Sequence, residues 1–208
     1  MTRGFQKVRR LSSASSVLQP TFLLTTEWLW YWEDVNGNWN QYDSPTNSST
    51  ELEQKFQNSP QVVVEFTAGS HAYTLSLQDM IQTNKSFGTK RLVRRRPRFR
   101  SSADVPVIRT RVGATGGAGG AGANGGACAT GGDGRRSPPR DKIEICLFFL
   151  EGNCIYHIEK CFGAHYRLPY SWEVREGNQW RLLDSSEKIE EDYCNPKKTY
   201  RYATRNSV

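Results

Sequence analysis

The feature that most constrains this chain is an aromatic run at residues 27–33, in which tryptophans stand at alternate positions. Large flat side chains at every second residue are typical of a β-strand with one buried face. The alternation therefore puts Trp28, Trp30 and Trp32 on the same face of a strand.

A hairpin is predicted immediately after this strand. Asn36-Gly37 supplies the positive φ that a tight turn requires, and residues 39–42 are expected to return as the second strand. Tryptophans in a hairpin are more often buried than exposed. Three of them are assigned to the core: Trp28, Trp30 and Trp39.

A short helix is predicted next. The segment has capping-box form, with a Thr50 hydroxyl to accept from free amides and a Glu53 carboxylate three residues later. Leu52 and Phe56 then lie on one side of the helix. Pro60 ends it, because proline cannot continue the hydrogen-bond ladder.

Three further strands are predicted after the helix. Residues 61–66 are rich in β-branched side chains, residues 71–77 alternate, and residues 91–96 form a basic strand that closes the unit. The order is therefore β-β-α-β-β-β within about seventy residues, which indicates a small α+β domain.

The spacing of these residues resembles that of a WWE domain, over residues 26–98. It is most similar to the second WWE domain of the CCCH-type poly(ADP-ribose) polymerase and zinc-finger antiviral protein family. The resemblance implies a half-barrel of about six strands packed on one helix, and binding of ADP-ribose units of poly(ADP-ribose). The motifs that carry it are Trp28-x-Trp30-x-Trp32-Glu33, Asn36-Gly37-x-Trp39-x-x-Tyr42, Val64-Glu65-Phe66, Tyr73-x8-Gln82 and Arg91-x-Val93.

The same resemblance implies a ligand-binding set. Such a ligand offers a flat ring, a polar ring edge and two phosphates, which call for stacking, an amide and a cation. For Trp32 the alternative is a place in the core, and for Gln82 it is simple exposure to solvent. The implied residues are Trp32, Tyr42, Tyr73, Gln82 and Arg91.

Two flanking segments resemble pieces of further WWE units. In residues 1–25, the stretch 5–11 echoes the closing strand 90–95 and looks like the last strand of a preceding unit, followed by a serine-rich link. Residues 168–208 look like the front half of another unit, with Trp172 aligned on Trp32. We hypothesise that these two pieces complement each other, within one chain or between two.

Residues 141–167 carry a metal-ligand pattern, Cys146-x7-Cys154-x6-Cys161-x3-His165. Three thiolates and one imidazole form a closed tetrahedral set for one structural zinc ion. His157 lies between these ligands and is not expected to bind. The aromatics of this CCCH finger that could stack on RNA are Phe148, Phe149, Tyr156 and Phe162. For the finger as a whole, packing against a WWE unit is preferred to RNA binding.

Residues 99–140 are expected to be a linker that is first arginine-rich and then glycine- and alanine-rich, with Cys128 as an isolated thiol. With a net charge of +7 and a pI near 9.3, the chain favours polyanionic partners. The alternative is a solvated basic run. The candidate nucleic-acid residues are Arg94, Arg95, Arg96, Arg98 and Arg100.

No catalytic constellation is recognisable, so a non-enzymatic role is expected. The first hypothesis is a module that reads poly(ADP-ribose) or ADP-ribosylated proteins. The alternative is an RNA-binding protein that uses the finger and the arginine-rich linker, with the WWE unit as a protein-interaction scaffold. No apolar run approaches a membrane span, and cysteines at metal-like spacing favour a reducing compartment, the nucleus and/or the cytoplasm.

Overall fold

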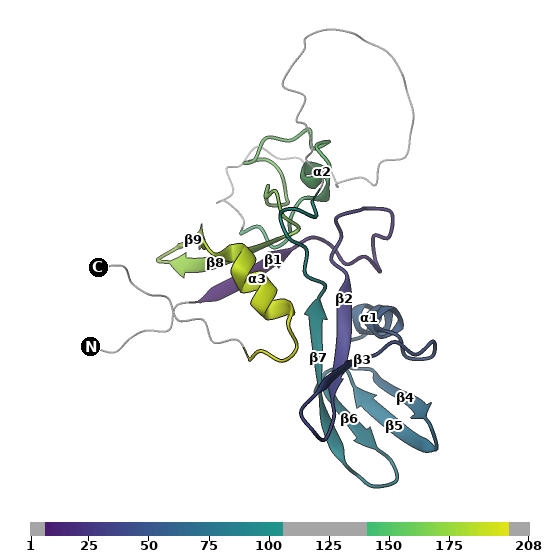
Figure 1. Cartoon of the computed structure of the whole chain (residues 1–208). Coiled ribbons are helices and arrows are strands. Elements are labelled where there is room, and N and C mark those ends of the chain that lie inside the picture. Colours follow the sequence, from purple (N-terminus) through teal and green to yellow (C-terminus); the bar gives the residue numbers. More distant parts are fainter. Residues whose placement is uncertain (1–6, 106–140, 200–208) are drawn as a thin grey trace, which may run out of the picture.

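The computed structural model describes residues 7–105 and 141–199, which form two antiparallel sheets, each packed on a helix (Figure 1). The first sheet has the order β3-β2-β7-β6-β5-β4 and packs on α1 (Ser49–Asn58). This confirms the predicted α+β half-barrel. Its strands are β2 (Trp28–Glu33), β3 (Trp39–Gln41), β4 (Val63–Ala68), β5 (His71–Ser76), β6 (Ile81–Asn84) and β7 (Lys90–Pro97).

Alternation places the tryptophans of β2 as predicted. Along β7, the partners of Trp28, Trp30 and Trp32 are alternate residues, so all three side chains face the same side of the sheet. Trp30 is completely buried at the centre of the core, whereas Trp28, also assigned to the core, is only half-buried and lies outside the core cluster. The assignment of Trp39 to the core is wrong, because it lies opposite Glu33 and therefore on the other face.

The helix begins differently from the predicted capping box. Ser48 is the N-cap, and its hydroxyl accepts from the backbone N–H of Glu51 at 3.3 Å. Thr50 lies inside the first turn, and the side chain of Glu53 is buried. Leu52 and Phe56 do pack on the sheet side of the helix, as predicted. The structure also adds β6, which the sequence had not indicated.

Four side chains satisfy the buried carboxylate of Glu53, and one of them is Ser15, whose hydroxyl donates to Oε1 at 3.5 Å. The indole of Trp30 donates to Oε2 at 3.2 Å, and Arg95 approaches both oxygens at 2.7 Å in a fork. Gln57 donates to Oε1 at 2.6 Å. A buried carboxylate is tolerated only with such compensation, so this cluster joins α1 to the neighbouring strands β2 and β7.

The second sheet is assembled from both ends of the described chain. Its order is β1-β8-β9, and α3 covers it (Figure 1). β1 pairs with β8 from Val8 opposite Val174 to Ser12 opposite Tyr170, which is the complementation that we hypothesised. The elements are β1 (Val8–Ser12), β8 (Tyr170–Glu176), β9 (Gln179–Leu182) and α3 (Ser186–Cys194).

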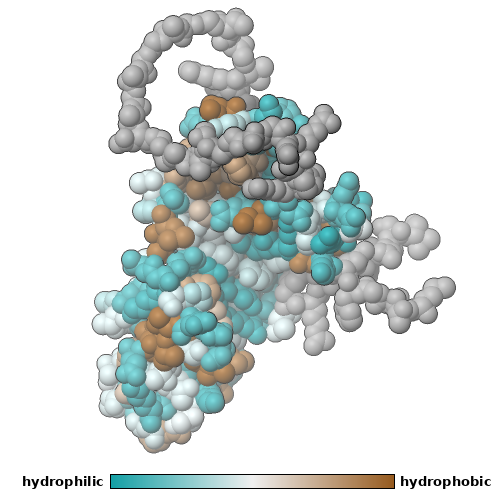
Figure 2. Space-filling model, turned by 180° about the vertical axis from the view of Figure 1, so that it is seen from behind, coloured by the Kyte–Doolittle hydropathy of each residue, from teal (hydrophilic) through white to brown (hydrophobic). Residues whose placement is uncertain are grey.

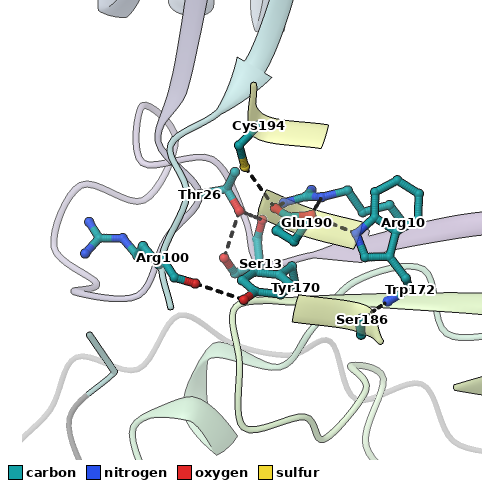
Figure 3. Close-up of polar contacts among 9 residues, drawn as sticks. All are labelled: Arg10, Ser13, Thr26, Arg100, Tyr170, Trp172, Ser186, Glu190 and Cys194. Atoms are coloured by element: carbon teal, nitrogen blue, oxygen red, sulfur yellow. Dashed lines mark hydrogen bonds and ion pairs between the residues drawn. The ribbon is translucent and has the colours of Figure 1, made fainter. Parts of the chain in front are cut away.

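The second sheet repeats the buried cluster of the first. Arg10 donates to both oxygens of Glu190, at 2.8 and 2.6 Å, and the indole of Trp172 donates to the same carboxylate at 2.8 Å (Figure 3). The backbone N–H of Trp172 donates to the Ser186 hydroxyl, as that of Trp30 donates to Ser49.

Trp172 therefore corresponds to Trp30, and the alignment of Trp172 on Trp32 was two residues out of step. Val174 takes the place of Trp32, two residues further along the strand. The reason is loop length. Five residues lie between Glu33 and its partner Trp39 in the first hairpin, and four lie between Arg175 and its partner Trp180 in the second. The spacing between the two tryptophans therefore differs between the hairpins.

The cysteine-rich segment packs on this second unit, as expected. Leu11 and Leu24 form a cluster with Ile145, Leu150 and Ala164, and α2 (Leu147–Leu150) belongs to this segment. The linker prediction falls largely outside the described residues, as does Cys128. None of the helices in the described ranges is long and apolar enough to span a membrane.

Arg10→Ala should destabilise the second unit, because it leaves the Glu190 carboxylate, 1% exposed, without its cation. Breaking a buried ion pair costs about 3–5 kcal/mol. We expect amide hydrogen exchange in β8 and α3 to accelerate accordingly, while β4–β6 keep their protection.

The control is Lys55→Ala, which removes half of a partly exposed pair with Glu51. It should cost about 0.5 kcal/mol or less. Unchanged exchange in β8 and α3 of the Arg10 variant would show that this ion pair does not hold the second unit together.

Candidate functional site

Four of the ligand-binding residues that the resemblance implies lie on neighbouring strands of the first sheet, and Tyr42 follows β3 directly. Gln82 in β6 stands opposite Arg91 in β7 and Leu75 in β5, and Leu75 is fully buried in the core. Because Arg91 and Val93 share a face and Val93 stands opposite Trp32, this row continues onto the tryptophan. The sheet thus brings Trp32, Gln82 and Arg91 to its inner face.

Tyr42 and Gln82 are joined by a short hydrogen bond. The Tyr42 hydroxyl donates to Gln82 Oε1 at 2.5 Å, and the two residues are only 4% and 5% exposed. Burial raises the pKa of Tyr42 well above its usual range, although the charge of Arg91 opposes the shift. The phenol therefore stays protonated and remains a hydrogen-bond donor.

Aromatic rings continue from Tyr42 towards β5. The Phe66 ring meets Tyr42 edge-on at 6.2 Å between centroids and stacks on Tyr73 at 5.5 Å with 17° between the planes. Phe66 was part of the recognised motif but was not among the candidate site residues. Its place opposite Tyr73 in the β4–β5 pair accounts for the contact.

Trp32 and Arg91 form the polar end of this site. The Arg91 guanidinium lies 5.0 Å from the centroid of the Trp32 ring, and Trp32 itself is half-buried against the core. Within the described residues, Arg91 makes no ion pair with a carboxylate. A cation next to a flat ring and a buried amide suits an anion that also carries an aromatic group.

Several of the arginines suggested for nucleic acid have partners inside the protein. Arg95 is paired with Glu53 and Arg98 with Glu27. Their guanidinium groups bind carboxylates of the same unit, so these two arginines stabilise the first unit.

Arg94 and Arg96 instead contact the second unit. Arg94 donates to backbone carbonyls after α3, including that of Lys198 at 3.3 Å, and Arg96 lies 4.9 Å from the centre of the Tyr193 ring. The carbonyl of Arg100 accepts from Tyr170 at 2.9 Å (Figure 3). A role in nucleic-acid binding stays a prediction for all five arginines.

A second candidate site is the cysteine–histidine cluster. Ligand atoms of four residues lie within 4.8 Å of one another: Cys146, Cys154, Cys161 and His165. His157 is outside this group, as expected.

Two distances between ligand atoms match those of a tetrahedral metal site. Cys154 Sγ lies 3.9 Å from Cys161 Sγ and 3.5 Å from His165 Nε2. Tetrahedral zinc with ordinary bond lengths would require about 3.8 Å and about 3.6 Å. Burial raises the pKa of Cys146 to about 12, so its thiolate needs a bound cation.

Packing around the cluster is close. The His165 imidazole stacks on Phe149 at 4.2 Å, which fixes the plane of the ring. Gly163 is required, because a Cβ at that position would stand 2.7 Å from the Cα of Cys146.

Three of the four finger aromatics are exposed, namely Phe148, Tyr156 and Phe162. Phe148 also meets Phe22 edge-on at 5.8 Å. On the face shown in Figure 2, apolar surface is divided into separate patches by hydrophilic side chains. The finger segment also exposes three isoleucines, Ile143, Ile155 and Ile158.

Comparison with known families gives two matches. Residues 28–95 match the WWE domain family, and residues 170–208 match a second family model that is also described as a WWE domain. Together with the six-stranded sheet and α1, the first match shows that this unit is a WWE domain. The second match falls on the sheet that β1 completes.

Similar proteins were found among curated sequences. The chain is 37% identical over 125 residues to the human protein mono-ADP-ribosyltransferase PARP12, covering 53% of this chain and 18% of that protein. It is 44% identical over 113 residues to the mouse zinc finger CCCH-type antiviral protein 1, covering 50% of this chain and 12% of that protein. The human protein mono-ADP-ribosyltransferase PARP11 is 30% identical over 77 residues, covering 35% and 23%. The chain thus spans less than a quarter of each relative.

Gly163→Ala should weaken metal binding, since the added methyl group meets the backbone of Cys146. Overpacking of this kind costs about 1–3 kcal/mol, which is about a 5- to 150-fold loss of affinity. Titration with Co²⁺, followed by its thiolate absorption bands, measures the change. Asn153→Ala, at an exposed position of the same segment, is the control, and equal Co²⁺ affinity for both variants would contradict this packing.

Proposed function

We propose that the WWE domain of this chain, residues 26–98, is a non-catalytic module that binds ADP-ribose units of poly(ADP-ribose) or of ADP-ribosylated proteins. The observation that supports this most is the convergence, on one face of the sheet, of a flat ring, a buried amide and a cation that forms no ion pair with any described residue. The similarity to ADP-ribosyltransferases, although limited to a fraction of their length, agrees with it.

Each group has a distinct part in this proposal. Trp32 supplies a face for adenine, and a base–aromatic stack of this kind is worth about 1–3 kcal/mol. Arg91 pairs with phosphate oxygens, for which a guanidinium fork is well shaped. Gln82 meets the edge of the base, and Tyr73 closes the pocket from β5.

The second unit is proposed to be a scaffold rather than a second reader. Val174 stands where Trp32 stands, and Leu183 takes the place of Tyr42, since each donates its N–H to the carbonyl of the corresponding tryptophan. The second unit therefore has neither the flat ring nor the phenol at these positions.

The cysteine–histidine cluster is proposed to hold one structural zinc ion. Four protein ligands leave no open position for a substrate. The ion would fix the finger that packs on Leu11 and Leu24, and so on the second unit. Its contribution is to folding, because a finger of this size cannot bury a sufficient apolar core by itself.

RNA binding is a second candidate function, and the exposed rings of Phe148, Tyr156 and Phe162 favour it. The partners found for Arg94, Arg95, Arg96 and Arg98 weigh against an arginine-based site beside the first sheet.

Calorimetric titration of the full chain with ADP-ribose should show saturable binding. Trp32→Ala and Arg91→Ala should each weaken it about 5- to 150-fold, through lost stacking and lost phosphate pairing. Trp180→Ala is a matched control, because that ring also lies beneath an arginine, at 4.1 Å, but in the second unit. Its affinity for ADP-ribose should equal that of the wild type.

Salt separates the two candidate functions. A pocket for one ADP-ribose unit loses little affinity as salt rises, whereas an RNA site that holds many phosphates loses it steeply. No ADP-ribose binding by the folded wild-type chain, together with salt-sensitive RNA binding that is lost in Phe162→Ala, would favour RNA instead.

A further inference from the structure

Tyr42 is held in place by contacts of its backbone and its ring. Its backbone N–H donates to the Trp30 carbonyl at 2.9 Å, and its own carbonyl accepts from both the N–H and the hydroxyl of Ser49. Its ring is fixed by Phe66. Every one of these contacts belongs to the core of the sheet and to the start of α1.

The Tyr42 hydroxyl forms a hydrogen bond with one atom of Gln82. It donates to Oε1, and the positive charge of Arg91 beside the phenol favours an oxygen at that end of the amide. In residues 7–105 and 141–199, no group accepts a hydrogen bond from the Gln82 amide nitrogen. A side chain that is 5% exposed thus has a satisfied acceptor and an unused pair of donors.

This arrangement restricts what Gln82 can recognise. An amide usually reads adenine with both ends, its oxygen accepting from the exocyclic amine and its nitrogen donating to a ring nitrogen. Here the oxygen is committed to Tyr42 in a buried position. That oxygen keeps one lone pair, whereas neither of the two N–H donors of the amide is used by a described residue, so the donors are the larger free capacity for the ligand.

We propose that Tyr42 is a positioning residue that does not contact the ligand, and that it orients Gln82 so that the amide nitrogen donates to an unprotonated ring nitrogen of the bound purine. This proposal rests on the proposed function, and it adds which atoms of Gln82 and of the purine meet. A purine ring nitrogen is then the ligand atom that the amide nitrogen of Gln82 contacts.

The test is a double-mutant cycle on the full chain with ADP-ribose as the probe. Tyr42→Phe should weaken binding about tenfold, because the amide is no longer held in one orientation. In the Gln82→Ala background, where affinities in the millimolar range are read from the Trp32 indole resonance, adding Tyr42→Phe should change nothing further. Tyr170→Phe is the matched control, since it removes another buried tyrosine hydroxyl, which donates to the Arg100 carbonyl, and it should leave the affinity unchanged.

A second readout follows the amide itself. The side-chain NH₂ resonances of Gln82 should shift on titration with ADP-ribose in the wild type. In Tyr42→Phe, the shift should be reduced while the thermal unfolding midpoint of the domain shows that the fold is retained.

The outcomes separate this proposal from the one beneath it. No binding by the wild-type chain would overturn the proposed function. Wild-type binding with additive losses for Tyr42→Phe and Gln82→Ala would make Tyr42 a ligand contact and overturn the positioning role alone. Unmoved Gln82 amide resonances at saturation would overturn the donor role of Gln82 and leave the reader function standing.

Discussion

The buried carboxylate of Glu53 is the interaction on which the first sheet depends. An unpaired carboxylate in that position would be prohibitively costly, so Trp30, Arg95 and Gln57 must all reach it. These contacts fix the register of β2 against β7, because a slip of one residue would put Trp30 and Arg95 on opposite faces of the sheet. Trp32 and Arg91 lie on the same face, so the geometry of the candidate pocket follows from that register.

The same cluster explains how a unit can be built from two ends of one chain. Arg10 arrives on β1, whereas Trp172 and Glu190 arrive on β8 and α3, and the buried ion pair selects the strand that carries the arginine. The outer faces also correspond: Arg94 lies 4.3 Å from the Trp39 ring and Arg9 lies 4.1 Å from the Trp180 ring. Arg94 then reaches the segment after α3, so the outer face of the first unit holds the second.

Sequence patterns predicted those features that depend on periodicity or spacing. The alternating tryptophans gave the inner face, and the cysteine–histidine spacing gave the cluster. Features that depend on long-range partners were missed. Glu53 fits a capping box equally well, because the carboxylate that could cap a helix is the one that Arg95 binds. The run Arg94–Arg96 read as a basic patch, but in a strand its members alternate between faces and meet different partners. β6 is only four residues long, too short for alternation to be recognised.

The buried carboxylate cluster and the candidate pocket use different residues on one face, and this separation explains how the two units can differ. The buried carboxylate cluster involves Trp30 in one unit and Trp172 in the other. The position of the candidate pocket lies two residues further along, at Trp32 in one unit and Val174 in the other. A substitution at the second position leaves the carboxylate cluster untouched. A unit can therefore keep its fold while losing the flat ring of the candidate pocket, and its remaining surfaces contact the finger and the neighbouring unit.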